Sequence, residues 1–344
     1  MTDFTSALYL GWTHAWLESG APPQPLTLGK PAALQEPPGA VSLARRIAQL
    51  TRFEAALCAP STLHLAIDVS AAFARQNAAF FVEDGIYPIC RYGVELAQAR
   101  GCPVYRFPHH DPAALSLALR QTRRPPVVVA GGFCPSCGAL APLASYLNLV
   151  RRHEGILLID DSQALGILGS RANGISPASP YGSGGGGSFS HLALQGHDIV
   201  VISSLSKAFG APVACLLGSS DFIRSLASTG TRLHSSPPST SAIRAGLHAL
   251  ERNAQMGDPL RRHLFQTVTT FRSLLQQRGW KLTPGAFPVQ AILHPNAPAV
   301  HARLLRNGIR ALLQPARVIF ILNATHQIAG IHPLVSALDR ASTT

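Results

Sequence analysis

The sequence predicts an α/β protein whose mainly parallel β-sheet is covered by helices on both faces. The main observation is a set of four apolar runs, separated by helical patterns, at residues 126–130, 156–159, 199–202 and 213–217. Continuous apolar runs, rather than alternating ones, are typical of strands buried on both faces of a parallel sheet. A length of 344 residues with 47% hydrophobic content is sufficient for one large α/β core and a smaller second unit.

The order of these patterns divides the chain into three parts. Residues 1–39 are rich in proline and glycine, and we expect them to form an N-terminal arm that packs on a partner subunit. The arm contains the aromatic residues Tyr9, Trp12 and Trp16. Residues 40–250 alternate between strand and helix patterns, which predicts a large α/β domain. Residues 251–344 begin with a long helical pattern and end in a short αβ unit, which predicts a small C-terminal α+β domain.

The net charge of +12 is spread along the chain and is not gathered in a tail. Because the sequence has neither a nucleic-acid-binding motif nor a basic run with interleaved aromatic residues, we expect no nucleic-acid partner. An arginine-rich surface suits an anionic partner such as coenzyme A or an acidic carrier protein. No apolar run reaches the length of a membrane span and the first residues lack a basic start, so we expect a cytoplasmic protein without a membrane partner.

Lys207 is one of only three lysines, and it follows the apolar run 199–202 in the sequence Ser-Leu-Ser-Lys-Ala-Phe-Gly. An amine is a nucleophile only when it is unprotonated, and removal from water favours that form of lysine. A lysine among apolar residues and small hydroxyls at a strand end is therefore a candidate for Schiff-base chemistry. The alternative is a surface lysine in a loop.

Two carboxylates, Asp160 and Asp161, follow the apolar run 156–159. Ligands of open α/β sheets bind at the carboxyl ends of the strands, although an aspartate at this place can also cap the next segment. A carboxylate together with a Schiff-base lysine is the fixed requirement of a pyridoxal phosphate site. The carboxylate keeps the pyridine nitrogen protonated, and the lysine holds the aldehyde.

Three motifs, at residues 160–169, 198–210 and 235–238, resemble in sequence and order the corresponding stretches of the α-oxoamine synthases. This family is typified by 8-amino-7-oxononanoate synthase and belongs to the fold-type I pyridoxal phosphate-dependent enzymes. The resemblance runs with gaps from about residue 40 to the C-terminus. It implies the fold of a fold-type I transferase and pyridoxal 5'-phosphate as the cofactor.

The resemblance also implies roles for individual residues. Lys207 corresponds to the lysine that forms the Schiff base with the cofactor, and Asp160 to the carboxylate that faces the pyridine nitrogen. Ser204 matches a phosphate-binding hydroxyl, and Ser206 is a second candidate for the same contact.

Two further pairs of hydroxyls correspond to phosphate contacts of the family. Ser61 and Thr62 fall where the phosphate loop meets a helix N-terminus, whose free amides suit an anion. An ordinary helix cap is the alternative for this pair. Ser235 and Ser236 match a segment that reaches the phosphate of the neighbouring subunit, which implies a homodimer with shared active sites.

The sequence departs from the family around the cofactor. Tyr87 occupies the place of a histidine that stacks on the cofactor ring, and an aromatic ring preserves that stacking. Gln163 replaces a histidine of the Asp-x-x-His motif; it can donate a hydrogen bond to the phenolic oxygen but does not exchange a proton. Gly131 and Pro135 fall at the places of a glutamate and a serine.

The substrate-binding arginine of the family is also displaced. The alignment puts Ile319 at its position, whereas Arg317 lies two residues earlier and projects from the same face of a strand. A shifted contact between Arg317 and the substrate carboxylate is therefore expected.

Six cysteines include the pair Cys134-Pro-Ser-Cys137, which could be a redox site or half of a zinc site. Because no second pair has zinc spacing, we expect reduced cysteines beside the active site and no metal. The glycine-rich stretch 174–187 is expected to form a surface loop over the site entrance.

Three functions are compatible with these residues. The first is the decarboxylative condensation of an amino acid with an acyl thioester, which follows the resemblance. The second is transamination of an amine or amino acid, which needs Lys207 but no thioester pocket. The third is a non-catalytic dimeric scaffold. The substituted family positions favour this function. The retained Lys207 and Asp160 argue against it, because burying an amine and a carboxylate without a use costs free energy.

Overall fold

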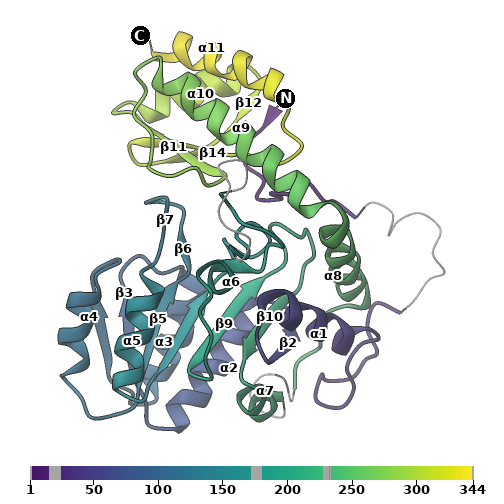
Figure 1. Cartoon of the computed structure of the whole chain (residues 1–344), viewed down its shortest axis with the longest axis vertical. Helices are drawn as coiled ribbons and strands as arrows, with labels where there is room; N and C mark the ends of the chain where they lie inside the picture. The colour runs from purple at the N-terminus through teal and green to yellow at the C-terminus, as the bar shows by residue number, and fades with distance from the viewer. Residues whose placement is uncertain (1, 15–24, 172–179, 228–231, 233, 343–344) are drawn as a thin grey trace.

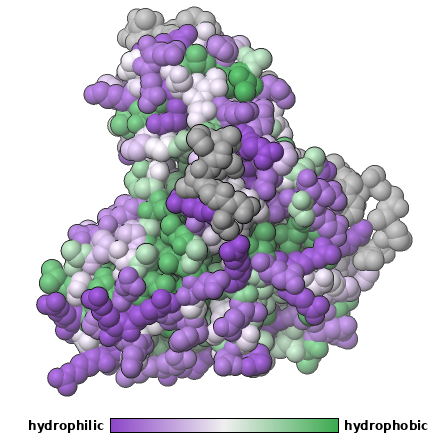
Figure 2. Space-filling model, viewed as in Figure 1, coloured by the Kyte–Doolittle hydropathy of each residue, from purple (hydrophilic) through white to green (hydrophobic). Residues whose placement is uncertain are grey.

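The computed structural model describes residues 2–14, 25–171, 180–227, 232 and 234–342. A large unit contains the central sheet, and a smaller unit of helices and strands from the C-terminal part of the chain lies beside it (Figure 1). On the face shown in Figure 2, hydrophilic residues dominate the lower margin of the large unit, and hydrophobic residues gather below the C-terminal unit. In the described part of the chain, no helix combines the length and hydropathy needed to cross a membrane.

The large unit is built on a seven-stranded sheet in the order β2-β10-β9-β8-β5-β3-β4. Its strands are β2 (Ala55–Ala59), β3 (Ala79–Glu83), β4 (Val104–Phe107), β5 (Pro126–Gly131), β8 (Ile156–Asp160), β9 (Ile199–Ser204) and β10 (Ala214–Gly218). The strands from β4 to β9 pair in parallel, whereas β10 pairs antiparallel with both of its neighbours. The predicted mainly parallel sheet is confirmed, and the four predicted strands coincide with β5, β8, β9 and β10.

Helices bury both faces of this sheet, as the continuous apolar runs predict. They are α1 (Ala40–Thr51), α2 (Thr62–Arg75), α3 (Pro88–Ala99), α4 (Pro112–Leu119), α5 (Leu143–Arg152), α6 (Gly187–Leu192), α7 (Ser220–Ala227) and α8 (Thr240–Arg252). Successive residues of β3 point to opposite faces, so Phe80 joins the hydrophobic cluster beneath α2 and α3, whereas Phe81 joins the cluster beneath α5. Both phenylalanines are fully buried.

The C-terminal unit has its own antiparallel sheet in the order β11-β14-β13. The strands are β11 (Val289–Leu293), β13 (Leu312–Gln314) and β14 (Arg317–Ile321), and the helices are α9 (Asp258–Gln276), α10 (Ala297–Arg306) and α11 (Ile331–Ser342). A π-helical turn at Asn253–Gly257 joins α8 directly to α9. The division of the chain at residue 250 stays a prediction, because helical structure continues across it.

The N-terminal arm packs on its own chain. Strand β1 (Thr2–Asp3) pairs in parallel with β12 (Ile309–Arg310) of the C-terminal unit. Tyr9 and Trp12 are buried, and Trp12 stacks on Phe209 with 6.0 Å between ring centroids. The expectation that these two aromatic side chains pack on a partner subunit is therefore wrong, whereas Trp16 lies outside the described residues.

The described part of the glycine-rich stretch is not a surface loop. Tyr181 is buried and its hydroxyl donates a hydrogen bond to the carbonyl oxygen of Ala286 at 2.5 Å. The backbone N–H of Gly184 donates to Asp258, and Gly187, with φ +88°, leaves no room for a Cβ beside Asp161. Gly187 thus allows close backbone packing that a side chain would prevent. Residues 174–179 lie outside the described residues.

Candidate active site

A cavity of about 160 Å³ lies at the carboxyl ends of β3, β5 and β8. It is lined by Glu83, Gly85, Ile86, Tyr87, His109, His110, Gly131, Phe133, Cys134, Pro135, Ser136, Asp160, Gln163 and Lys207. Four predicted site residues therefore meet there: Lys207, Asp160, Tyr87 and Gln163. They come together because parallel neighbouring strands end at the same edge of the sheet.

Lys207 lies in the turn that follows β9, and because β9 ends at this edge of the sheet, the lysine lies there too. Burial lowers the pKa of its amine, while the nearby carboxylate of Asp160 opposes that shift. The amine Nζ lies 5.9 Å from the centroid of the Tyr87 ring. A partly desolvated lysine with a lowered pKa holds more of the unprotonated, nucleophilic form.

The two adjacent aspartates have different surroundings. Asp160 is half-buried and lines the cavity; its Oδ1 accepts a hydrogen bond from the N–H of Ser162 at 3.0 Å, and its Oδ2 accepts one from Cys90 Sγ at 3.8 Å. Asp161 is buried and accepts hydrogen bonds from the N–H and the hydroxyl of Ser188 at 2.8 and 2.5 Å. Burial raises the pKa of Asp161 to about 7. Asp161 thus ties β8 to α6, and Asp160 is the carboxylate of this pair that lines the cavity.

Tyr87 and Gln163 lie on the same cavity but differ in exposure. Tyr87 is 62% exposed, so its ring can move against a bound ligand. Gln163 is fixed by the hydroxyl of Tyr9, which donates to Gln163 Oε1 at 2.6 Å. Tyr9 was not predicted to lie here, since this contact joins residues 154 positions apart.

The serines after β9 do not line this cavity. Ser204 ends the strand, and its hydroxyl accepts a hydrogen bond from the N–H of Ser206 at 3.2 Å. The hydroxyl of Ser206 donates to the carbonyl of Ala211 at 3.3 Å. These contacts shape the turn that presents Lys207.

Helix α2 begins at Thr62 with Ser61 at its N-cap, where the sequence predicts a helix start. Ser61 makes no side-chain cap; instead its Oγ lies 2.8 Å from His64 Nδ1. Ser235 and Ser236 line a small pocket beside this helix start, together with His64 and Arg232. The structure therefore places both predicted hydroxyl pairs, Ser61 with Thr62 and Ser235 with Ser236, around the start of α2 and outside the lining of the main cavity.

Arg317 lies elsewhere. It is the first residue of β14 and pairs with Leu293 and Gln314 in the C-terminal sheet. Among the described residues that line the cavity there is no arginine, and Lys207 is the one lysine. Gly131 and Pro135, at the places of the family glutamate and serine, do line it.

Sequence reasoning missed three ionisable residues of the cavity, Glu83, His109 and His110. Glu83 ends β3, and the two histidines follow β4, so the strand-end rule that selected Asp160 could also have selected them. Cys134 lines the cavity, so the expected place of this cysteine pair beside the site is confirmed, and no disulfide joins Cys134 to Cys137 in the structure. Burial raises the pKa of Cys137 to about 11, which makes its thiol a weak nucleophile at neutral pH.

Similar proteins share this sequence pattern and this fold. The chain is 30% identical over 267 residues to 8-amino-7-oxononanoate synthase from Ralstonia pickettii, an alignment that covers 72% of this chain and 60% of the relative. It is 28% identical over 315 residues to the synthase of the same name from Marinobacter nauticus, covering 87% and 75%. The chain thus spans about three fifths of the length of the first relative. The resemblance inferred from the three motifs is confirmed.

Solved structures confirm the fold. Serine palmitoyltransferase from Sphingomonas wittichii superposes with a TM-score of 0.83 at 16% identity, covering 98% of this chain and 86% of that one. 8-Amino-7-oxononanoate synthase from Francisella tularensis superposes with a TM-score of 0.76 at 16% identity, covering 99% and 97%. The sequence profile of aminotransferase class I and II matches residues 23–319. The chain therefore belongs to the aminotransferase class I and II family.

Proposed function

We propose that this protein is a pyridoxal phosphate-dependent transferase that condenses an amino acid with an acyl thioester. The observation that supports this proposal most directly is the convergence of Lys207, Asp160 and Tyr87 on one cavity. A desolvated amine, a carboxylate and an aromatic ring are the groups that a pyridoxal ring needs around it, so the residues fit the cofactor. The relatives named 8-amino-7-oxononanoate synthase support the acyl-transfer reaction.

When bound, pyridoxal phosphate supplies a protonated ring that accepts the electron pair released at the substrate's α-carbon. Lys207 would hold the cofactor's aldehyde carbon through Nζ and afterwards move a proton at the α-carbon. The carboxylate of Asp160 would keep the proton on the pyridine nitrogen. Tyr87 would lie against the ring face, and its exposure allows that adjustment.

Other side chains would orient the cofactor. The Oε1 of Gln163 is engaged by Tyr9, which leaves the Nε2–H groups to donate to the phenolic oxygen. Ser204, Ser206 and the uncapped start of α2 at Ser61 and Thr62 would bind the phosphate.

The reaction balances without an oxidant. Lys207 would take the α-proton of the amino acid, and the electron pair of that bond remains at the α-carbon. The α-carbon then forms a carbon–carbon bond with the acyl carbonyl, and the thiolate leaves and takes up a proton from solvent. The carboxylate then leaves as carbon dioxide, and Lys207 would return a proton to the α-carbon. The product is an α-aminoketone.

The test is a thiol-release assay with purified protein and pyridoxal phosphate, in which each amino acid is paired with acyl-coenzyme A donors. Thiol release that requires an amino acid, together with an α-aminoketone detected by mass spectrometry, supports condensation. A parallel assay supplies α-keto acids as amino-group acceptors. If these are aminated and no thiol is released, the protein is an aminotransferase. If neither reaction occurs with the cofactor bound, the protein is a diverged scaffold.

Transamination is the second candidate because of one observation in the cavity. The condensing relatives are expected to hold a substrate carboxylate with an arginine, and the described cavity lining contains none, since Arg317 lies in the C-terminal sheet. An amine donor without a carboxylate would need no such contact.

We further propose that the protein is a cytoplasmic homodimer with shared active sites. Support comes from the resemblance of Ser235 and Ser236 to a segment that reaches the phosphate of the neighbouring subunit; in the single chain they line a small pocket beside the start of α2. Sedimentation of the purified protein at micromolar concentration should give the mass of two chains, and the mass of one chain would contradict this part.

A further inference from the structure

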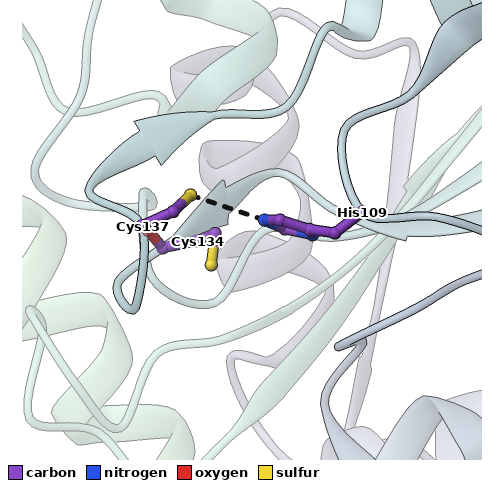
Figure 3. Close-up of side chains that lie close together, drawn as sticks. All are labelled: His109, Cys134 and Cys137. Carbon is purple, nitrogen blue, oxygen red and sulfur yellow. Dashed lines mark hydrogen bonds between the residues drawn. The ribbon is translucent and has the colours of Figure 1, made fainter.

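Two cysteines and a histidine gather at the side of the cavity. Cys134 belongs to the short hairpin of β6 (Phe133–Cys134) and β7 (Ala139–Leu140), and Cys137 lies in its turn. His109 follows β4 and reaches the same place from the edge of the large sheet. Figure 3 shows the Cys137 sulfur and the His109 ring pointing toward one another, with Cys134 on the same turn.

The distances fit a tetrahedral metal ion. A tetrahedral zinc ion separates a thiolate sulfur from an imidazole nitrogen by about 3.5 Å, given its usual bond lengths. In this structure His109 Nε2 lies 3.4 Å from Cys137 Sγ. The ligating atoms of His109, Cys134 and Cys137 all lie within 4.8 Å of one another. Two sulfurs and one nitrogen are donors that zinc binds strongly.

The hairpin holds the two sulfurs on one turn. The N–H of Gly138 donates to the carbonyl of Cys134 at 2.9 Å, which closes the turn. Gly138 has φ +71°, and a Cβ there would lie 1.9 Å from the carbonyl oxygen of Pro284, so no other residue fits. The turn is therefore fixed before any ion binds.

The histidine also has a suitable outer partner. Its Nδ1 lies 3.7 Å from Glu83 Oε1, on the ring side opposite the cysteines. Glu83 is buried and held by the hydroxyl of Tyr146 at 2.7 Å and the N–H of His110 at 2.9 Å. A histidine that ligates zinc through one nitrogen commonly directs the other to such a carboxylate, which orients the ring.

The ring of His110 stacks on that of His109 with 3.7 Å between centroids and 24° between planes. Its Nδ1 lies 3.9 Å from Cys137 Sγ, farther than the 3.4 Å between His109 Nε2 and the same sulfur. His109 is therefore the better placed of the two histidines for an ion bound to Cys137. Three protein ligands leave a fourth position for water or for a substrate group, as in catalytic zinc sites.

We propose that His109, Cys134 and Cys137 bind a Zn²⁺ ion beside the cavity that contains Lys207. The sequence gives only half of a zinc pattern, because the third ligand comes from a strand end 25 residues before the first cysteine. His109 is exposed and both cysteines are half-buried, so an ion can enter from solution. The site needs no pyridoxal phosphate and is independent of the proposed function.

The test measures zinc in the full-length protein loaded with its cofactor. The protein is incubated with zinc chloride under reducing conditions, dialysed into metal-free buffer and analysed by mass spectrometry for metals. We expect about one zinc ion per chain. The double variant Cys134→Ser/Cys137→Ser and the single variant His109→Ala should each lose the bound zinc. The matched controls Cys102→Ala and His153→Ala should each keep it.

Cobalt substitution distinguishes thiolate ligation from a surface histidine contact. Co²⁺ held by two sulfurs in a tetrahedral site absorbs at the red end of the visible spectrum, away from the cofactor, and this absorbance should vanish in the double cysteine variant. Two results would overturn the proposal: zinc content in the wild type no higher than in the double variant, or a disulfide between Cys134 and Cys137 that forms in air while zinc stays at background. Circular dichroism of each variant checks its fold.

Discussion

Two regions meet at the cavity, and they differ in how the chain positions their side chains. The ends of β8 and β9 deliver Asp160 and Lys207 from the centre of a buried parallel sheet. The hairpin β6–β7, which follows the interior strand β5, and the segment after the edge strand β4 bring Cys134, Cys137 and His109 together. The strand ends hold the two groups that the proposed cofactor site requires, whereas the hairpin and the segment after β4 hold the proposed zinc ligands. Proposed cofactor binding and proposed zinc binding thus depend on separate segments around one cavity.

The largest expected effect belongs to the sheet ends. Lys207→Ala should lower the rate of thiol release by about 10⁴-fold, because both the covalent attachment and the proton transfer depend on this amine. The thiol-release assay measures it.

Lys281→Ala is the matched control, since Lys281 is exposed, and it should keep the wild-type rate. The two regions are separable if Lys207→Ala still binds zinc while His109→Ala still binds the cofactor. Loss of both properties in either variant would contradict that separation.

Asp160→Ala comes next. It should lower turnover by about 10³-fold while the cofactor stays attached, because the ring nitrogen would no longer be held protonated. Turnover and the cofactor's absorbance are measured on the same sample. Normal turnover would mean that another carboxylate faces the ring.

Asp161→Asn tests the contrast between the adjacent carboxylates. Burial raises the pKa of Asp161 from 3.8 to about 7, so the folded protein holds its proton more tightly than the unfolded chain. This proton stabilises the fold fully below pH 4, and the stabilisation is lost as the pH rises through about 7. Urea unfolding of the wild type should therefore lose roughly 2–3 kcal/mol between pH 4 and 7 relative to Asp161→Asn, whose amide oxygen can accept from the N–H of Ser188 and whose amide nitrogen can donate to the Ser188 hydroxyl. Equal pH dependence would contradict the assigned burial.

The smallest effect is expected at Tyr9. Tyr9→Phe removes the hydrogen bond to Gln163 Oε1 and should lower the free energy of unfolding by about 1 kcal/mol. It should also raise the apparent dissociation constant of pyridoxal phosphate slightly, since Gln163 would be less fixed. Fluorescence titration with the cofactor measures this, and a tighter complex would contradict the orienting role.

The difference between the regions also explains what could be predicted from the sequence. The strands β5, β8, β9 and β10 follow from their apolar runs, but the reversed direction of β10 does not, because such a run carries no information on direction. Asp160 and Lys207 could be predicted because each lies at or shortly after the end of an apolar run that forms a strand. Tyr9 beside Gln163 and His109 beside Cys137 were not, because tertiary packing joins distant residues there.

The burial of the glycine-rich segment illustrates the same limit. Glycines at 182, 185 and 187 suggest a loop by composition, yet here they let the backbone pack against residues 165–170 and Asp161. Composition indicates freedom of the backbone, and only the surrounding contacts decide whether that freedom serves a loop or close packing.

The central claim is that Lys207 holds pyridoxal phosphate. The most direct measurement is to incubate the protein with the cofactor, reduce it with borohydride, digest it and find the modified peptide by mass spectrometry. We predict a pyridoxyl phosphate group on Lys207 and none on Lys30 or Lys281. Modification distributed over all three lysines, or absent from Lys207, would contradict the proposed site.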